Sequence, residues 1–110
     1  MKTFKIFVAK EAELFLSANY DYLYALNPIA ANKWLDGITR KINELTTFPN
    51  KGAIIPEAEN EPSLANLHQI FYSMSSSGST FRIIYTVEDD VFKIVNIITI
   101  RSSSQEPIVR

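Results

Sequence analysis

The chain has 110 residues, of which 46% are hydrophobic and 21% are charged, and its formal net charge is −1. This composition is typical of one globular domain, which we expect to span residues 1–110, and the near-neutral charge disfavours a broad phosphate-binding surface. The chain has no cysteine, which excludes disulfides and thiolate chemistry and leaves only His68 and carboxylates for a zinc site.

The first half of the chain predicts a strand followed by two helices. Residues 3–8 alternate as a short strand, with Phe4, Ile6 and Val8 on one face. The spacing becomes helical from about Ala9, and Asn27-Pro28 ends this helix and begins the next, because Asn can cap a helix and Pro suits its first position. The second helix is expected to run to about Thr47. Its apolar stripe consists of Ala31, Trp34, Leu35, Ile38, Ile42 and Leu45.

The second half predicts a loop and then strands. Residues 49–63 hold three prolines, a glycine and the acidic residues Glu57, Glu59 and Glu61, which favours a solvated, mobile loop. Strands are expected over 64–74, 81–87 and 91–101. A two-residue turn at Asp89-Asp90 would pair Val87 with Phe92 and Tyr85 with Ile94.

This register assigns each residue of the last hairpin to a face of the sheet. The face toward the helices would carry Phe81, Ile83, Tyr85, Val87, Phe92, Ile94, Ile98 and Ile100. The open face would carry Arg82, Ile84, Thr86, Lys93, Val95, Ile97, Thr99 and Arg101. The predicted fold is therefore α+β: a twisted antiparallel sheet with an N-terminal strand and a helical hairpin packed on one face.

The N-terminal segment and the acidic turn exclude some kinds of site. Charge at Lys5, Lys10 and Glu11 interrupts any apolar core of a signal peptide, and no later stretch reaches membrane-spanning length. We therefore expect a cytoplasmic protein with no membrane partner. Acidic residues 88–90 are typical of a hairpin turn, so we expect no metal and no cofactor.

Three segments resemble, in order and spacing, the toxins of the RelE/ParE superfamily, and the resemblance covers nearly the whole chain. The segment LNPIAANKWLDGITRKINELTTFPNKG is similar to the second helix of the family and the turn after it. FRIIYTVEDD resembles the central strand, in which an arginine precedes an aliphatic pair and an aromatic residue. IRSSSQEP resembles the C-terminal stretch of the family. The resemblance implies a toxin of a type II toxin–antitoxin system that a cognate antitoxin neutralises. It also implies that the chain forms either a toxin–antitoxin hetero-oligomer or a homodimer.

Arg82 and Arg101 are the strongest candidate site residues. A guanidinium within an apolar strand requires an anionic partner, which can belong to the protein or to a ligand. The two arginines could be structural, could bind the antitoxin or target, or could stabilise a phosphorane in RNA cleavage. Lys93, His68 and Ser102 are further candidates for target or antitoxin binding, although a lone histidine in an apolar strand is more often structural.

The resemblance leaves three functions open. The chain could bind a cellular target, with DNA gyrase favoured as for ParE-like members, or it could be a ribosome-dependent, metal-independent mRNA endoribonuclease, as RelE-like members are. It could also be a non-toxic interaction module with the same fold. Ser102 stands where the family often has histidine, and MSSSGST replaces the basic residues of ribosome-cleaving members. These departures favour target binding over catalysis.

Overall fold

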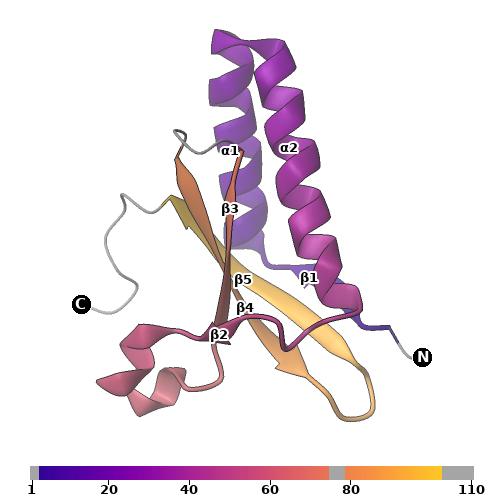
Figure 1. Cartoon of the computed structure of the whole chain (residues 1–110), viewed down its shortest axis with the longest axis vertical. Coiled ribbons are helices and arrows are strands. Elements are labelled where there is room, and N and C mark those ends of the chain that lie inside the picture. The colour runs from indigo at the N-terminus through magenta and orange to yellow at the C-terminus, as the bar shows by residue number, and fades with distance from the viewer. Residues whose placement is uncertain (1–2, 75–78, 103–110) are drawn as a thin grey trace.

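The computed structural model describes residues 3–74 and 79–102, which form a five-stranded sheet with two helices on one face (Figure 1). The strands are β1 (Lys5–Val8), β2 (Ala53–Ile54), β3 (His68–Ser73), β4 (Thr80–Glu88) and β5 (Ile94–Ser102). The helices are α1 (Lys10–Leu26) and α2 (Pro28–Asn43), and 3₁₀ segments span Glu44–Thr46, Pro56–Glu59 and Pro62–Leu64. The strand order is β1-β5-β4-β3-β2, in which β1 runs parallel to β5 and all other pairs are antiparallel. The predicted α+β class is confirmed. The sheet is mixed rather than wholly antiparallel, because β1 runs parallel to β5.

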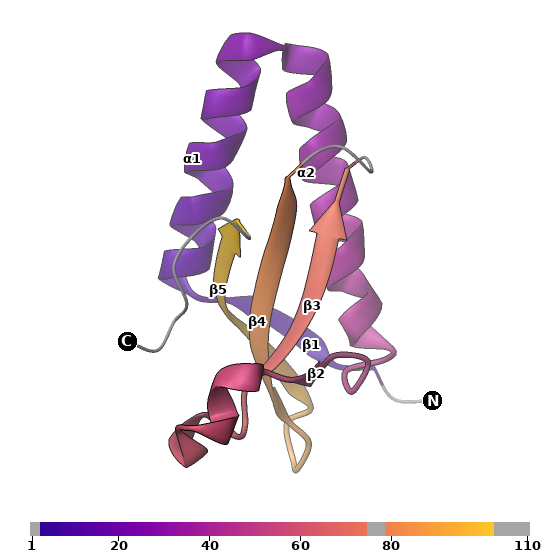
Figure 2. The ribbon, with the colours of Figure 1, turned by 60° about the vertical axis from the view of Figure 1, so that its left-hand side comes forward.

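The helical hairpin forms where the capping residues predict it. The Asn27 side chain accepts hydrogen bonds from the backbone N–H groups of Ile29 and Ala30, at 3.0 and 3.2 Å, and Pro28 occupies the first helical position. The two helices are joined without an intervening loop, so α2 folds back antiparallel to α1 (Figure 2). The buried face of α2 consists of four residues of the predicted stripe: Ala31, Trp34, Ile38 and Ile42.

The core lies between this hairpin and the facing side of the sheet. Trp34 packs edge-on against Phe81, with ring centroids 5.4 Å apart, and Phe15 contacts the same ring at 6.0 Å. Removing a buried aromatic side chain of this kind typically costs about 3–5 kcal/mol. The sheet contributes the buried residues Ile70, Phe81, Ile83, Tyr85, Val95, Ile97 and Ile100.

The predicted register of the β4–β5 hairpin is wrong. Val87 pairs with Val95 rather than Phe92, and Tyr85 pairs with Ile97 rather than Ile94. The connection is longer than a two-residue turn, since β4 ends at Glu88 and β5 begins at Ile94. A shift by an odd number of residues reverses which face each side chain occupies.

The corrected register exchanges the faces of the first half of β5. Val95 and Ile97 are fully buried in the core, whereas Phe92 is 69% exposed and Ile98 is 36% exposed. A register irregularity between Ile84 and Tyr85 adds one more residue on β5. Beyond this point, the observed pairing therefore differs from the predicted pairing by an even number of residues. The predicted faces of Ile100 and Arg101 are therefore correct.

The segment expected to be a loop covers part of the open face. Ile55 is buried, and its backbone N–H donates to the carbonyl of Leu67 at 3.0 Å. The following 3₁₀ segments lie at the end of the molecule opposite the tip of the helical hairpin (Figure 1). This packing against β4 brings Glu57 to the sheet, where the sequence indicated only a solvated loop.

Candidate functional site

Two arginines lie side by side on the sheet face that points away from the helices. Arg82 in β4 and Arg101 in β5 are direct partners across the strands, so both side chains leave the same face. The prediction that they share the open face is confirmed. Like charges directly opposite each other destabilise a sheet unless anions lie close by.

Arg82 is bound by a carboxylate and an amide. Its Nη1 and Nη2 donate to Oε2 and Oε1 of Glu57 at 2.8 and 2.5 Å, and its Nε donates to Oε1 of Gln69 at 2.7 Å. The side chains of Arg82 and Glu57 are each only 14% exposed. The planar guanidinium is thus held in a bidentate ion pair, the geometry in which Arg binds carboxylates most strongly. The structure supports a structural role for Arg82, because this pair fastens the 3₁₀ segment onto the sheet.

Sequence reasoning missed both partners of Arg82. Glu57 lies 25 residues from Arg82 along the chain, and nothing in its local sequence distinguishes it from Glu59 and Glu61. Gln69 is diagonal to Arg82 across β3 and β4. Its position next to the arginine could be inferred only once the pairing of these strands was known.

His68 lies on the opposite face of the sheet, in a clamp with Tyr85. The two residues pair across β3 and β4, and their rings stack with centroids 5.4 Å apart. Nδ1 of His68 is 3.1 Å from the carbonyl oxygen of Gly52, which can only accept, so this nitrogen carries the hydrogen. The Tyr85 hydroxyl donates to the carbonyl of Pro49 and accepts from the N–H of Gly52, each at 2.9 Å. His68 therefore helps to hold the loop after α2 and does not join the arginines.

Within the clamp the Tyr85 side chain is buried, which changes the pKa of its hydroxyl. Tyr85 is fully buried, and burial raises the pKa of its hydroxyl above the usual value, although the N–H of Gly52 and the charge of Lys51 oppose this. Gly52 is required for close approach here: a Cβ at this position would lie 2.3 Å from the carbonyl oxygen of Gln69 and 2.7 Å from the Tyr85 hydroxyl.

Lys93 and Ser102 lie at opposite ends of β5. Lys93 precedes the strand with a left-handed φ of 54°, forms an ion pair with Asp89, and lies 5.9 Å from the ring centroid of Phe4. The prediction that Lys93 shares the open face with the arginines is wrong, because it followed from the two-residue turn. Ser102 is the last residue of β5 and pairs with Phe81, next to Arg101 in sequence. The roles of both residues in binding stay predictions.

The arginine site has limited means for acid–base chemistry. Arg82 contacts one carboxylate, of Glu57, and one amide, of Gln69, and the only histidine of the chain lies on the other face. Within residues 3–74 and 79–102, no group of three acidic, histidine or cysteine side chains could hold a metal ion. The arrangement provides cations that can bind an anion, and it provides a carboxylate already engaged by Arg82.

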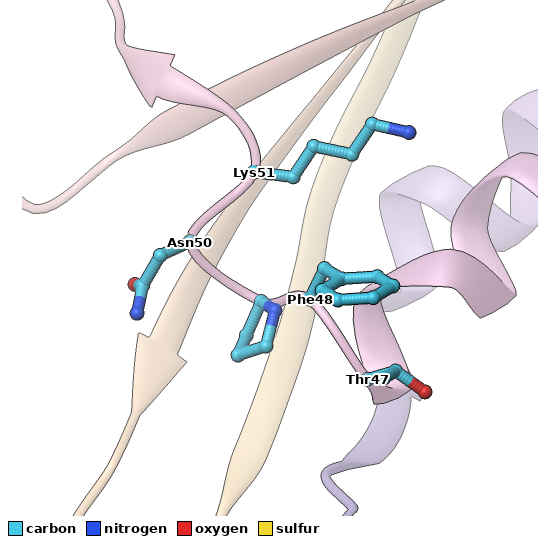
Figure 3. A pocket seen from close by; sticks show the side chains of 5 residues that line it. Thr47, Phe48, Asn50 and Lys51 are labelled. Atoms are coloured by element: carbon cyan, nitrogen blue, oxygen red, sulfur yellow. The ribbon is translucent and has the colours of Figure 1, made fainter.

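A separate open pocket of about 530 Å³ lies at the turn after α2. Its described lining consists of the consecutive residues 47–51, and none of the predicted site residues is among them. Phe48 and Lys51 project to one side of the turn and Asn50 to the other (Figure 3). Lys51 forms an ion pair with Glu44, so its charge is already compensated. The described lining of this pocket therefore provides no group of side chains arranged for catalysis or for binding a charged ligand.

The comparisons with known proteins agree with this architecture. Residues 6–107 match the sequence profile of the ParE toxin of the type II toxin–antitoxin system parDE. A chain from the solved structure described as a chromosomal ParDE TA system from P. aeruginosa superposes with a TM-score of 0.64 over 91% of this chain and 96% of that chain, at 19% sequence identity. Among curated proteins, none is significantly similar in sequence.

The sequence profile and the matching fold together define a RelE/ParE-like toxin domain. Because the family profile spans nearly the whole sequence, the chain belongs to the ParE toxin family of type II toxin–antitoxin systems. In the part of the chain that the structure describes, neither helix is long and apolar enough to cross a membrane.

Proposed function

We propose that this ParE-family chain inhibits growth by binding a cellular target, with DNA gyrase favoured, and that a cognate antitoxin neutralises it. The observation that carries the proposal is that the Arg82 guanidinium already has partners within the chain. Its guanidinium is engaged by Glu57 and Gln69, so the open face offers a binding surface more readily than a free catalytic cation. A protein-binding toxin needs a shaped and charged surface, and it needs no general acid–base pair.

The antitoxin is proposed to complement the charge of this face. Arg101 lies beside Arg82 on this face, and Glu57 is bound to Arg82. An acidic segment of an antitoxin crossing the open face would be attracted by the positive potential of the two neighbouring arginines. We expect the protein in the cytoplasm, where it would form either a toxin–antitoxin hetero-oligomer or a homodimer.

Expression of the chain with and without the protein encoded by the adjoining reading frame tests the toxin assignment. We expect growth arrest when the chain is expressed without this protein and rescue on co-expression. Absence of arrest despite accumulation of soluble chain would contradict the proposal and favour a non-toxic interaction module.

The target is tested by two assays on the same arrested cells and the same purified chain. Inhibition of DNA supercoiling by purified gyrase, with intact mRNA in the cells, is the expected result. The competing function is mRNA cleavage, in which Arg82 and Arg101 would supply the cations that stabilise the phosphorane. Primer extension that shows discrete, codon-linked cuts in mRNA would establish that function and overturn gyrase as the target.

A further inference from the structure

The outer edge of β1 is open for part of its length. β1 ends the strand order of the sheet and pairs with β5 (Figure 1). The backbone N–H groups of Lys5 and Ala9 donate to carbonyl groups of β5 and of the residue before it, at 2.9 and 2.8 Å. Because successive backbone groups of a strand alternate in direction, the N–H and C=O groups of Ile6 and Val8 point away from the sheet. In the part of the chain that the structure describes, no other strand pairs with this edge.

The open stretch is bounded at both ends. At its start, the N–H of Phe4 lies on the same outer edge and donates to the carbonyl of Thr46 at 2.8 Å, so the 3₁₀ segment after α2 covers this position. At its end, the chain leaves the sheet at Ala9 and enters α1. A further strand can therefore pair along residues 5–9, and Phe7 is at the centre of this stretch.

The helix that follows β1 turns away from the open edge. In the first turn of α1, the Glu11 carboxylate accepts a hydrogen bond from the hydroxyl of Thr99 in β5, at 2.5 Å. The rest of α1 also packs over β5. The helix therefore lies on the β5 side of β1 and not beyond the open edge.

The side chains of the open stretch favour pairing with another strand. Ile6, Phe7 and Val8 are uncharged, and residues of these types are enriched in strands. Ile6 and Val8 pack against the core, whereas Phe7, on the other face, is 54% exposed. Natural edge strands usually carry a lysine, a proline or a bulge that blocks further pairing. The only charge of β1, at Lys5, lies at the end of the strand, and the pairing of β1 with β5 contains no bulge.

We propose that this edge binds the same edge of a second copy of the chain, antiparallel, about a two-fold axis at Phe7. The limits of the open stretch set this register, because it places residue 5 of one copy opposite residue 9 of the other. Ile6 of one copy then faces Val8 of the other, and the two residues exchange N–H···O bonds on each side of the axis. The two Phe7 residues form the intervening non-hydrogen-bonded pair, with Cα atoms about 4.5 Å apart and their rings in contact.

Charge and preorganisation favour a second copy over a flexible peptide. In this register the two Lys5 residues are offset by about 13 Å along the strands, which exceeds the screening length of about 8 Å at physiological salt. A second copy presents a strand that is already formed, whereas a peptide would lose its conformational freedom for a contact along residues 6–8 alone. The inference goes beyond the proposed function and requires neither the target nor the antitoxin.

Sedimentation equilibrium of the purified chain measures the association. A contact of this size is typical of a weak dimer, so we expect a Kd of about 10–100 µM. Phe7→Lys places two like charges opposite each other at the axis and should weaken the dimer by about 10-fold or more. Tyr22→Lys makes the same kind of change at a 65% exposed position of α1 and should associate as the unchanged chain does. Both variants should melt within about 2 °C of the unchanged chain, because exposed side chains are replaced.

A cysteine at the axis tests the register directly. The chain has no cysteine, so Phe7→Cys introduces a single thiol. In the proposed dimer two such residues lie about 4.5 Å apart between Cα atoms, which is within the range that a disulfide spans. Mild oxidation should therefore convert this variant into a covalent dimer, whereas Tyr22→Cys should stay monomeric.

Hydrogen exchange of the unchanged chain gives a measurement that depends on no variant. The amides of Ile6 and Val8 should exchange more slowly as the concentration rises through the Kd. The amides of Lys5 and Ala9, which already donate within the chain, should not change.

The outcomes decide whether the second copy occupies this edge. Concentration-dependent protection of Ile6 and Val8, together with the Phe7→Cys crosslink, supports the dimer. A chain that stays monomeric up to about 1 mM, or a dimer that folded Phe7→Lys does not weaken, overturns it. Protection that arises only when the protein of the adjoining reading frame is added would show that this protein occupies the edge, and would also overturn the second copy. None of these results bears on the growth arrest that tests the toxin assignment.

Discussion

Replacement of Arg82 by alanine distinguishes a structural arginine from a functional one. The substitution removes three hydrogen bonds, two to the Glu57 carboxylate and one to the Gln69 amide. It leaves a carboxylate whose side chain is only 14% exposed without its bidentate partner. The same substitution also relieves the repulsion between Arg82 and Arg101 across the strands.

The size of the effect follows from the burial of the pair. An exposed ion pair contributes roughly 0–1 kcal/mol, whereas breaking a fully buried pair costs about 3–5 kcal/mol. The pair lies between these limits and closer to the buried one, and the relieved repulsion lowers the cost, so we expect the free energy of unfolding to fall by about 2 kcal/mol. In a domain of this size that corresponds to a melting temperature lower by about 8–10 °C.

Thermal and urea unfolding of Arg82→Ala, Glu57→Gln and the double variant measure this pair. The double-mutant cycle should give a coupling free energy of about 1–2 kcal/mol, since each single change removes the same contact. Arg40→Ala, on the exposed side of α2, is the matched control and should change the free energy of unfolding by no more than about 0.5 kcal/mol.

Growth assays on the same variants complete the test. If Arg82→Ala melts within about 2 °C of the unchanged chain, the structural argument is refuted, because a broken bidentate pair at this burial cannot be neutral. Loss of toxicity in such a stable variant would identify Arg82 as a direct contact of the target. Loss of toxicity that tracks the loss of stability, with Glu57→Gln behaving alike, supports the structural role.

The remaining predictions concern Arg101 and the clamp after α2. Arg101→Ala should abolish toxicity. It should lower the melting temperature by less than Arg82→Ala does, because it removes a like charge opposite Arg82. An equal loss of stability would contradict this prediction. Since burial raises the pKa of Tyr85, the unfolded state loses this proton first, and stability should fall as pH rises above about 10. Tyr85→Phe should flatten that fall in alkaline melts and cost roughly 1–3 kcal/mol at neutral pH by leaving two loop groups unpaired, whereas exposed Tyr24→Phe should do neither. Gly52→Ala should destabilise by about 1–3 kcal/mol in urea unfolding, because its Cβ would meet the backbone of β3, and a gain of stability would refute the close approach.

Local patterns were sufficient for the helices and for the class of fold. Asn27-Pro28 ends one helix and caps the next through contacts within three residues, and the apolar stripe of α2 shows which side is buried. Helical periodicity and capping act over a few residues, so they can be read without knowing what lies across the core. The alternation of β4 likewise placed Arg82 on the face away from the helices, and that placement did not depend on the turn.

Contacts between distant segments were decided only by the folded chain. The length of the β4–β5 connection sets the register, and an odd error of register moved Val95 and Ile97 to the wrong face. The partners of Arg82 were equally hidden, because Glu57 reaches it from a 3₁₀ segment 25 residues away. Which acidic residue of that segment is buried depends on how the loop closes over the sheet, and closure depends on the packing of Ile55 and the Tyr85 clamp rather than on the sequence around Glu57.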